Sequence, residues 1–125
     1  MVELKKILLI DDSQTVQMIM GASLQASGYL VIYEKTAQAG VKAAVEQKPD
    51  LILLDLMLPD KNGFDVLKEL KEKEETKNIP VIILTAKDSG EEVIKGKQLG
   101  ADDYCVKLKT TPKVMQEKVS KLIGE

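Results

Sequence analysis

The chain of 125 residues contains no histidine, no arginine and a single cysteine, Cys105. Without histidine it lacks Ser-His and Cys-His nucleophile pairs, imidazole general bases and the commonest zinc ligands. Without arginine it cannot recognise phosphate or guanine through a bidentate guanidinium. Because the net charge is also −2, we expect no direct binding of nucleic acid. A single cysteine excludes a disulfide framework and favours a reducing, cytoplasmic setting.

Long apolar runs are missing as well. No stretch approaches the ~18–20 residues that span a bilayer, so we expect no membrane insertion. The first six residues lack the apolar segment of a signal peptide. The length and a composition of 44% hydrophobic and 30% charged residues fit one folded domain, residues 1–125.

Short apolar runs alternate with segments of helical periodicity along the chain. We predict strands at Lys5–Ile10, Tyr29–Glu34, Leu51–Leu54, Val81–Leu84 and Asp103–Val106. We predict helices at Gln14–Ala26, Ala37–Gln47, Phe64–Glu74, Glu91–Leu99 and Pro112–Ile123. Five strand–helix repeats predict an α/β fold of the flavodoxin-like type. It is a doubly wound, five-stranded parallel sheet of strand order 2-1-3-4-5 with five helices.

Five polar side chains follow the apolar runs of this predicted sheet: Asp11, Asp12, Asp55, Thr85 and Lys107. Because the carboxyl ends of parallel strands meet at one edge, we expect these side chains to lie together. Three neighbouring carboxylates need a compensating cation. Mg²⁺ prefers oxygen ligands, whereas zinc is disfavoured here. An aspartate pair alone is weak evidence, since Asp12 or Ser13 can simply cap a helix, but Asp55 on the neighbouring strand favours a magnesium site.

Asp55 is also a candidate nucleophile, because a carboxylate beside Mg²⁺ can attack phosphorus and form an acyl phosphate. The Thr85 hydroxyl and the Lys107 ammonium would then contact the phosphoryl oxygens. Taken singly, a strand-end threonine is usually a cap or turn residue, and a lysine is usually solvated. Their convergence with the three aspartates favours a phosphoryl site.

Four stretches resemble the receiver domain of bacterial two-component response regulators, in the chemotaxis-type single-domain form. The separations of 30 residues from Asp55 to Thr85 and of 52 residues from Asp55 to Lys107 are usual for that family. The stretches are Ile7–Ser13, Leu53–Gly63, Ile83–Ala86 and Gly100–Lys107.

The resemblance implies a role for each of these residues. Asp55 would accept a phosphoryl group from a sensor histidine kinase or a histidine phosphotransfer protein. Mg²⁺ would be held by Asp11, Asp12, Asp55 and the backbone carbonyl of Met57. Thr85 and the aromatic Tyr104 would form a switch pair, although a strand tyrosine is more often only packing. Switching would change the surface of the fourth helix, fifth strand and fifth helix, where a downstream protein docks, in a monomer or transient dimer.

Three departures from the family pattern bear on this hypothesis. Leu108 follows Lys107 where the family usually has a proline after a cis peptide. Because a cis bond before a non-proline residue costs roughly 2.5–4 kcal/mol, Lys107 can be placed differently here. Gln17 stands where many relatives carry arginine. Met57 and Lys87 occupy positions that tune the loss of phosphate, and they predict slow self-dephosphorylation, over minutes or longer.

Three alternatives remain open. A degenerate receiver, favoured by Leu108, would bind partners without phosphate. A Mg²⁺-dependent phosphatase with an aspartyl nucleophile is disfavoured because Leu56 and Met57, and no second aspartate, follow Asp55. A flavin-binding protein is disfavoured because no Ser/Thr-rich phosphate loop follows the first strand. We therefore expect a signalling domain whose chemistry is limited to its own phosphorylation and dephosphorylation.

Overall fold

The computed structural model describes residues 4–86, 90–107 and 109–124. In this part of the chain, five parallel strands form one sheet in the order β2-β1-β3-β4-β5. The strands are β1 (Lys6–Ile10), β2 (Leu30–Glu34), β3 (Leu51–Asp55), β4 (Val81–Thr85) and β5 (Asp103–Val106). The helices are α1 (Gln14–Ala26), α2 (Ala37–Gln47), α3 (Gly63–Glu72), α4 (Gly90–Gln98) and α5 (Pro112–Ile123). The predicted fold class and strand order are confirmed.

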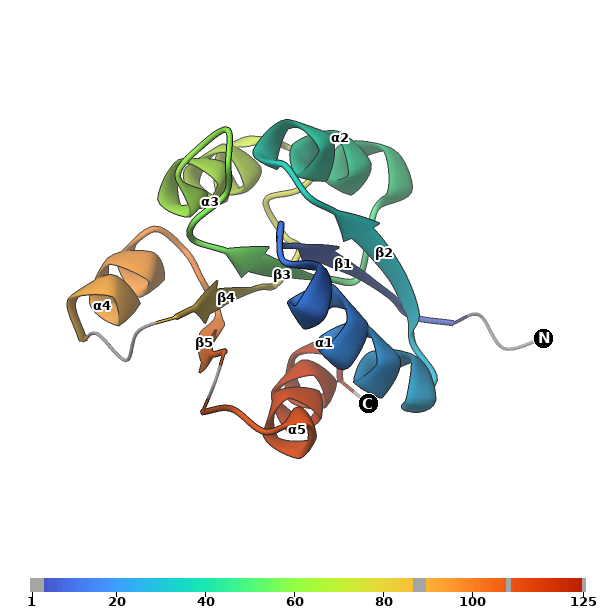
Figure 1. Cartoon of the computed structure of the whole chain (residues 1–125). Coiled ribbons are helices and arrows are strands. Elements are labelled where there is room, and N and C mark those ends of the chain that lie inside the picture. Colours follow the sequence, from blue (N-terminus) through green and yellow to red (C-terminus); the bar gives the residue numbers. More distant parts are fainter. Residues whose placement is uncertain (1–3, 87–89, 108, 125) are drawn as a thin grey trace.

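Helices cover both faces of the sheet, with α1 and α5 on one face and α2, α3 and α4 on the other (Figure 1). Alternate residues of β1 point to opposite faces, as the pleat of a strand requires. Ile7 and Leu9 pack with α1 and α5, and Leu8 and Ile10 pack with α2 and α3. This two-sided burial explains why the strands are continuous apolar runs instead of alternating patterns.

Strands β3 and β4, whose own last residues are site residues, are buried along their whole length. Every residue of β3 and β4 is buried, including the terminal Asp55 and Thr85. The start of α3 lies close against the end of β3, because Gly63 donates from its backbone N–H to the Leu56 carbonyl at 2.9 Å. A Cβ on Gly63 would come within 2.5 Å of the Asp55 carbonyl oxygen, so the approach requires glycine.

Helix α4 is attached more weakly than the other helices. Among its nine described residues, Gly96 alone is buried. A Cβ on Gly96 would collide with the Ile83 side chain, so the helix is seated on β4 at one point of close approach. A helix with so little buried apolar surface belongs to the least stable part of a fold.

None of the described helices combines the length and the apolar character that a membrane-crossing segment requires.

Candidate functional site

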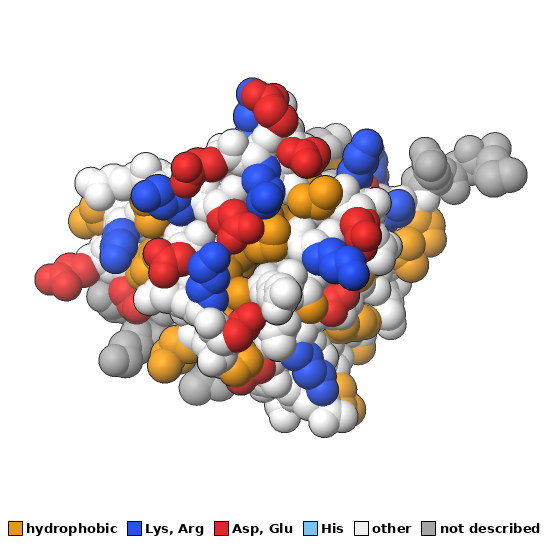
Figure 2. Space-filling model, turned by 90° about the horizontal axis from the view of Figure 1, so that it is seen from above, with side chains coloured by type: hydrophobic (Ala, Val, Ile, Leu, Met, Phe, Trp, Pro, Cys, Tyr) orange, Lys and Arg blue, Asp and Glu red, His pale blue; other side chains and the backbone are white. Residues whose placement is uncertain are grey.

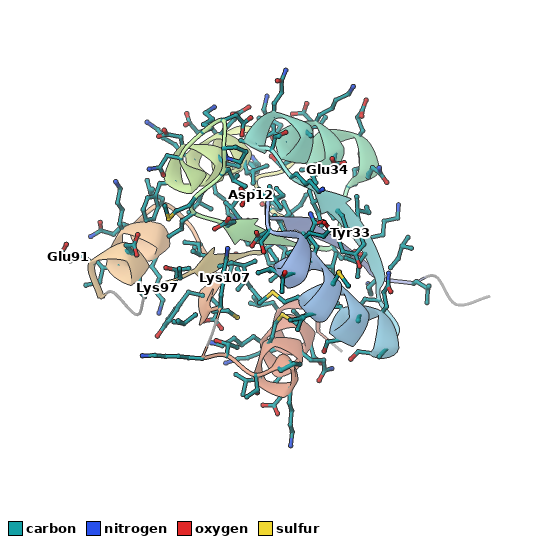
Figure 3. All side chains as sticks on the ribbon, viewed as in Figure 1. Asp12, Tyr33, Glu34, Glu91, Lys97 and Lys107 are labelled. Carbon is teal, nitrogen blue, oxygen red and sulfur yellow. The ribbon has the colours of Figure 1, made fainter. Side chains whose placement is uncertain are left out.

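Three aspartates meet at the carboxyl edge of the sheet, where the sequence predicts them. Asp11, Asp12 and Asp55 each place a carboxylate oxygen within 4.8 Å of the others. Asp11 is fully buried and Asp55 is 3% exposed, whereas Asp12 faces solvent. Asp12 and Lys107 lie near one another in the centre of the molecule as seen in Figure 3. The edge therefore presents a mostly buried acidic cluster with one solvent-facing member.

The loop after β1 fixes the orientation of Asp11. Its Oδ1 accepts a hydrogen bond from the Ser13 backbone N–H at 2.8 Å. The buried Gln17 amide donates to the Asp11 carbonyl at 2.8 Å and to the Glu34 carbonyl at 3.4 Å. Gln17 thus ties the start of α1 to the ends of β1 and β2, and it does so through an uncharged amide.

Lys107 lies between the two buried carboxylates. Its Nζ is 2.8 Å from Asp11 Oδ2 and 3.1 Å from Asp55 Oδ1, and its side chain is 16% exposed. The reading of Lys107 as an ordinary solvated lysine is therefore wrong. Its backbone N–H donates to the Thr85 carbonyl at 2.8 Å, which continues the β4–β5 pairing up to the site. The geometry of the peptide between Lys107 and Leu108 lies outside the described residues.

Burial and charge shift the pKa values of this group. Burial, assisted by the negative charge of Asp11, raises the pKa of Asp55 above its ordinary value, although the Met57 N–H and Lys107 oppose this. Burial lowers the pKa of Lys107, but the hydrogen bond to Asp11 and the charge of Asp55 outweigh it and leave the pKa raised. Lys107 is therefore a cation, and Asp55 is a more basic carboxylate than an exposed aspartate.

The donor set fits a hard divalent cation. Among the described residues of the cluster, three carboxylates face the single ammonium of Lys107, so the site keeps an excess of negative charge. Asp11 Oδ2 is buried, and its described partner is the Lys107 ammonium at 2.8 Å. Carboxylate oxygens of this kind are the ligands that Mg²⁺ prefers. These residues are thus suited to hold Mg²⁺.

Met57 lies in the loop that covers Asp55. Its backbone N–H donates to Asp55 Oδ1 at 3.1 Å, and its side chain is 76% exposed. The same loop is anchored at a distance by Asp60, which accepts from the N–H groups of Ala37 and Gln38 at 2.8 and 3.1 Å. These two donors hold the pKa of Asp60 below its ordinary value. Asp60 therefore fastens the loop to the start of α2.

A small cavity of about 100 Å³ opens directly above Asp55. Its walls combine the predicted site residues with one that the sequence did not indicate, Glu92 of α4. The lining is Asp55, Leu56, Met57, Thr85, Ala86, Glu92 and Lys107. The cavity therefore places the candidate nucleophile, hydroxyl and ammonium around one space of the size of a small anion.

A larger groove of about 490 Å³ runs between α2 and α3. That face carries interspersed lysine and acidic side chains (Figure 2). The charges there pair with one another, since Glu69 contacts Lys61 at 2.9 Å and Lys73 at 3.9 Å. In the smaller cavity, by contrast, Asp55, Thr85 and Lys107 converge on one space, which makes it the candidate functional site.

Thr85 and Tyr104 lie on neighbouring strands but in different surroundings. Thr85 is buried, and its hydroxyl donates to Glu92 Oε1 at 3.4 Å. Tyr104 is half-buried beside β4, away from the acidic cluster. The ammonium groups of Lys97 and Lys118 lie 5.9 and 5.4 Å from the centroid of its ring, which is within cation–π range. Tyr104 is therefore held from both α4 and α5.

Comparison with known proteins gives a consistent result. The family model described as "Response regulator receiver domain" matches residues 7–119. Protein PilH of Pseudomonas aeruginosa is 39% identical over 102 residues, which cover 82% of this chain and 84% of PilH. The phosphate regulon transcriptional regulatory protein PhoB of the same species is 40% identical over 103 residues. That match covers 82% of this chain but only 45% of PhoB.

A solved structure with a similar fold contains a metal ion. It is the receiver domain of the sensor histidine kinase PA1611 from Pseudomonas aeruginosa PAO1, with magnesium coordinated in its active site cleft. The two structures align with a TM-score of 0.89 and 28% identity over 98% of this chain and 100% of that one.

Proposed function

Because the chain belongs to the family of response regulator receiver domains, we propose that its Asp55 accepts a phosphoryl group from a phosphohistidine. The donor is a sensor histidine kinase or a histidine phosphotransfer protein. One observation supports the assignment to Asp55: this buried residue lines the small cavity, and its carboxylate contacts Lys107 at 3.1 Å. Of the three clustered aspartates, Asp55 is the one that lines this cavity together with Thr85 and Lys107.

The transfer forms one bond to phosphorus and breaks another. A carboxylate oxygen of Asp55 attacks phosphorus, the bond between phosphorus and the donor imidazole nitrogen breaks, and that nitrogen keeps the electron pair. Lys107 contributes positive charge where the phosphoryl oxygens arrive, because its ammonium already lines the same cavity. Asp11, Asp12, Asp55 and the backbone carbonyl of Met57 would hold Mg²⁺, which supplies positive charge against the oxygens of the reacting group.

Phosphorylation would then change the environment of Thr85 and Tyr104. The Thr85 hydroxyl turns toward a phosphoryl oxygen, and the Tyr104 ring moves inward into the space that this releases. Because Tyr104 contacts lysines of α4 and α5, its movement repacks the surface of α4, β5 and α5. We propose that a downstream protein docks there and that residues 1–125 act as one stand-alone receiver, monomeric or transiently dimeric. The similarity to PilH, of which the chain covers 84%, supports this arrangement.

The experiment that tests the proposal uses Mg²⁺ and acetyl phosphate as the donor. We expect one acid-stable, base-labile phosphate per chain in the wild type and none in Asp55→Asn. Asp65→Asn, which removes an exposed carboxylate from the first turn of α3, is the matched control and keeps the phosphate. Continuous hydrolysis of assorted phosphate esters would instead identify a phosphatase. Absence of both incorporation and Mg²⁺ binding would identify a degenerate receiver.

A further inference from the structure

Among the described residues that line the phosphoryl cavity, Glu92 is the one that does not come from a strand end or the loop after it. It lies in the first turn of α4, and its half-buried side chain reaches the cavity that Asp55 and Lys107 also line. Its Oε1 accepts the hydrogen bond from the Thr85 hydroxyl at 3.4 Å. A carboxylate thus already accepts from the hydroxyl that the proposed function assigns to a phosphoryl oxygen.

The contact between Glu92 and Thr85 conflicts with phosphorylation in two ways. A hydroxyl has a single proton to donate, so Thr85 cannot bond Glu92 and a phosphoryl oxygen at the same time through that proton. A phosphoryl group also brings a charge of roughly −1.5 to −2 into a cavity of about 100 Å³ that Glu92 shares. Repulsion between like charges at such short range is strong because the site is screened from solvent.

We propose that Glu92 is a gate for the phosphoryl cavity, an inference that rests on the proposed function of Asp55. In the unphosphorylated chain its carboxylate keeps the Thr85 hydroxyl turned away from Asp55 and disfavours entry of an anion. Phosphorylation displaces Glu92 and thereby moves the start of α4. Glu92 is a positioning residue here, since it acts on the reaction through Thr85 and through charge.

The attachment of α4 makes this displacement feasible. Gly96 is the buried residue by which the described helix is seated on the sheet, so moving its first turn exposes little apolar surface. In the resting state the negative side chain is favourably placed, because a carboxylate in the first turn of a helix interacts well with the helix dipole. The helix dipole therefore stabilises Glu92 in the resting state, and displacement of the first turn of α4 loses little apolar packing.

A role for Glu92 as a magnesium ligand is not supported by the geometry. The acidic groups that place their oxygens within 4.8 Å of one another, among the described residues, are Asp11, Asp12 and Asp55. The gate is thus expected to act on the anion and not on the metal, which gives the experiment a readout that general destabilisation would not change.

The test is a titration of the Mg²⁺-loaded chain with beryllofluoride, an anionic phosphoryl analogue, followed by NMR. We expect Glu92→Gln to bind beryllofluoride about fivefold more tightly than the wild type or better, a coupling typical of linked sites. Glu92→Ala, which also removes the acceptor, is expected to bind at least as tightly. Glu91→Gln is the matched control: the neighbouring residue is exposed and lies toward the outer side of α4 (Figure 3).

Three further readouts separate a gate from a structural role. The affinity for Mg²⁺ alone should be nearly equal in the wild type, Glu92→Gln and Glu91→Gln. The Thr85 methyl resonance of the anion-free chain should shift in both Glu92 variants and stay in place in Glu91→Gln. Raising the salt concentration should reduce the difference between the wild type and Glu92→Gln, because the effect is partly one of charge.

Two results would overturn the gate while leaving the phospho-acceptor intact. One is wild-type binding of beryllofluoride that neither Glu92 variant improves. The other is an equal improvement in Glu91→Gln, which would show a general charge effect. If the wild type binds Mg²⁺ but no beryllofluoride, the proposed function fails, and the gate fails with it.

Discussion

Lys107→Met should destabilise the chain without Mg²⁺ and increase its affinity for Mg²⁺. The substitution keeps an apolar stem of similar length and removes the ammonium that lies 2.8 Å from Asp11 and 3.1 Å from Asp55. Two carboxylates, one fully buried and one 3% exposed, then face each other without a counter-ion. The same ammonium is the internal competitor of any cation that binds these aspartates, so its removal favours metal binding.

The magnitude follows from the geometry. At an effective dielectric constant of about 20, unit charges about 3 Å apart attract by roughly 5–6 kcal/mol, before the cost of removing them from water. Measured losses on removing one partner of a buried ion pair are about 3–5 kcal/mol. Because the Lys107 side chain keeps 16% exposure, we expect a value near the lower limit, about 3 kcal/mol. Mg²⁺ at 100 times its dissociation constant stabilises either protein by about 2.7 kcal/mol, so the deficit shrinks in Mg²⁺ because the variant binds the ion more tightly.

Urea unfolding of the wild type and Lys107→Met, in EDTA and in saturating Mg²⁺, measures both quantities. Lys68→Met, which removes an exposed lysine of α3, is the matched control and should change stability little. The deficit also depends on pH. When folding raises the pKa of a carboxyl group, as for Asp55, the folded chain becomes less stable as the pH rises from the unfolded pKa through the folded pKa. The deficit of the variant should therefore shrink as the pH is lowered toward the ordinary pKa of an aspartate.

Two outcomes would refute this reasoning. Equal stability of the wild type and Lys107→Met in EDTA would show that the buried carboxylates do not depend on the ammonium. An equal deficit in EDTA and in saturating Mg²⁺ would show that the lost stability is apolar packing and not charge.

Three further predictions concern a buried thiol, a close backbone contact and the lifetime of the phosphate. Burial raises the pKa of Cys105 from 9.0 to about 11, so the free energy of unfolding should fall as the pH rises from about 9 to about 11. Alkaline urea unfolding should show the stability of the wild type relative to Cys105→Ala falling by up to about 3 kcal/mol over that range, and a constant difference would contradict it. Gly63→Ala places a Cβ 2.5 Å from the Asp55 carbonyl oxygen, and calorimetry should record a loss of about 2 kcal/mol together with weaker Mg²⁺ binding. The exposed, apolar Met57 side chain cannot orient an attacking water, so phosphorylated Asp55 should persist for minutes or longer, and decay within seconds in Mg²⁺ would oppose this. Lys87, the other residue behind the last prediction, lies outside the described residues.

The sheet could be predicted because each strand is a short apolar run buried on both faces, which alternates with helical periodicity. The end of α3 could not be placed in the same way. The charged residues after Glu72 favour helix, yet the chain leaves it at Lys73, whose backbone is extended. The reason is a buried side-chain contact: Thr76 is fully buried, and its hydroxyl donates to the Leu70 carbonyl at 2.6 Å. Burial of that hydroxyl draws the chain away from the helical path.

The site residues also differ in whether the sequence alone predicts their contacts. Topology alone brings strand-end residues such as Asp11, Asp55 and Lys107 to one edge, so their meeting could be predicted. Gln17 and Glu92 belong to helices, and their contacts depend on how α1 and α4 rotate against the sheet, which no sequence spacing reports. The two bonds of Asp60 to the start of α2 span 23 and 22 residues and likewise leave no local pattern.

The two lysines that flank the Tyr104 ring affect the electrostatic potential that the surface of α4 and α5 presents to a partner. An aromatic ring partly balances a cation that lies over its face. In the proposed switch the ring would withdraw, the ammonium of Lys97 would lose that balance, and Lys118 would keep its described contact with Asp103 at 3.0 Å. Addition of negative charge at Asp55 would thus make the surface of α4 and α5 more positive. A partner with acidic side chains would recognise phosphorylation as a change in surface potential, in addition to a change in shape.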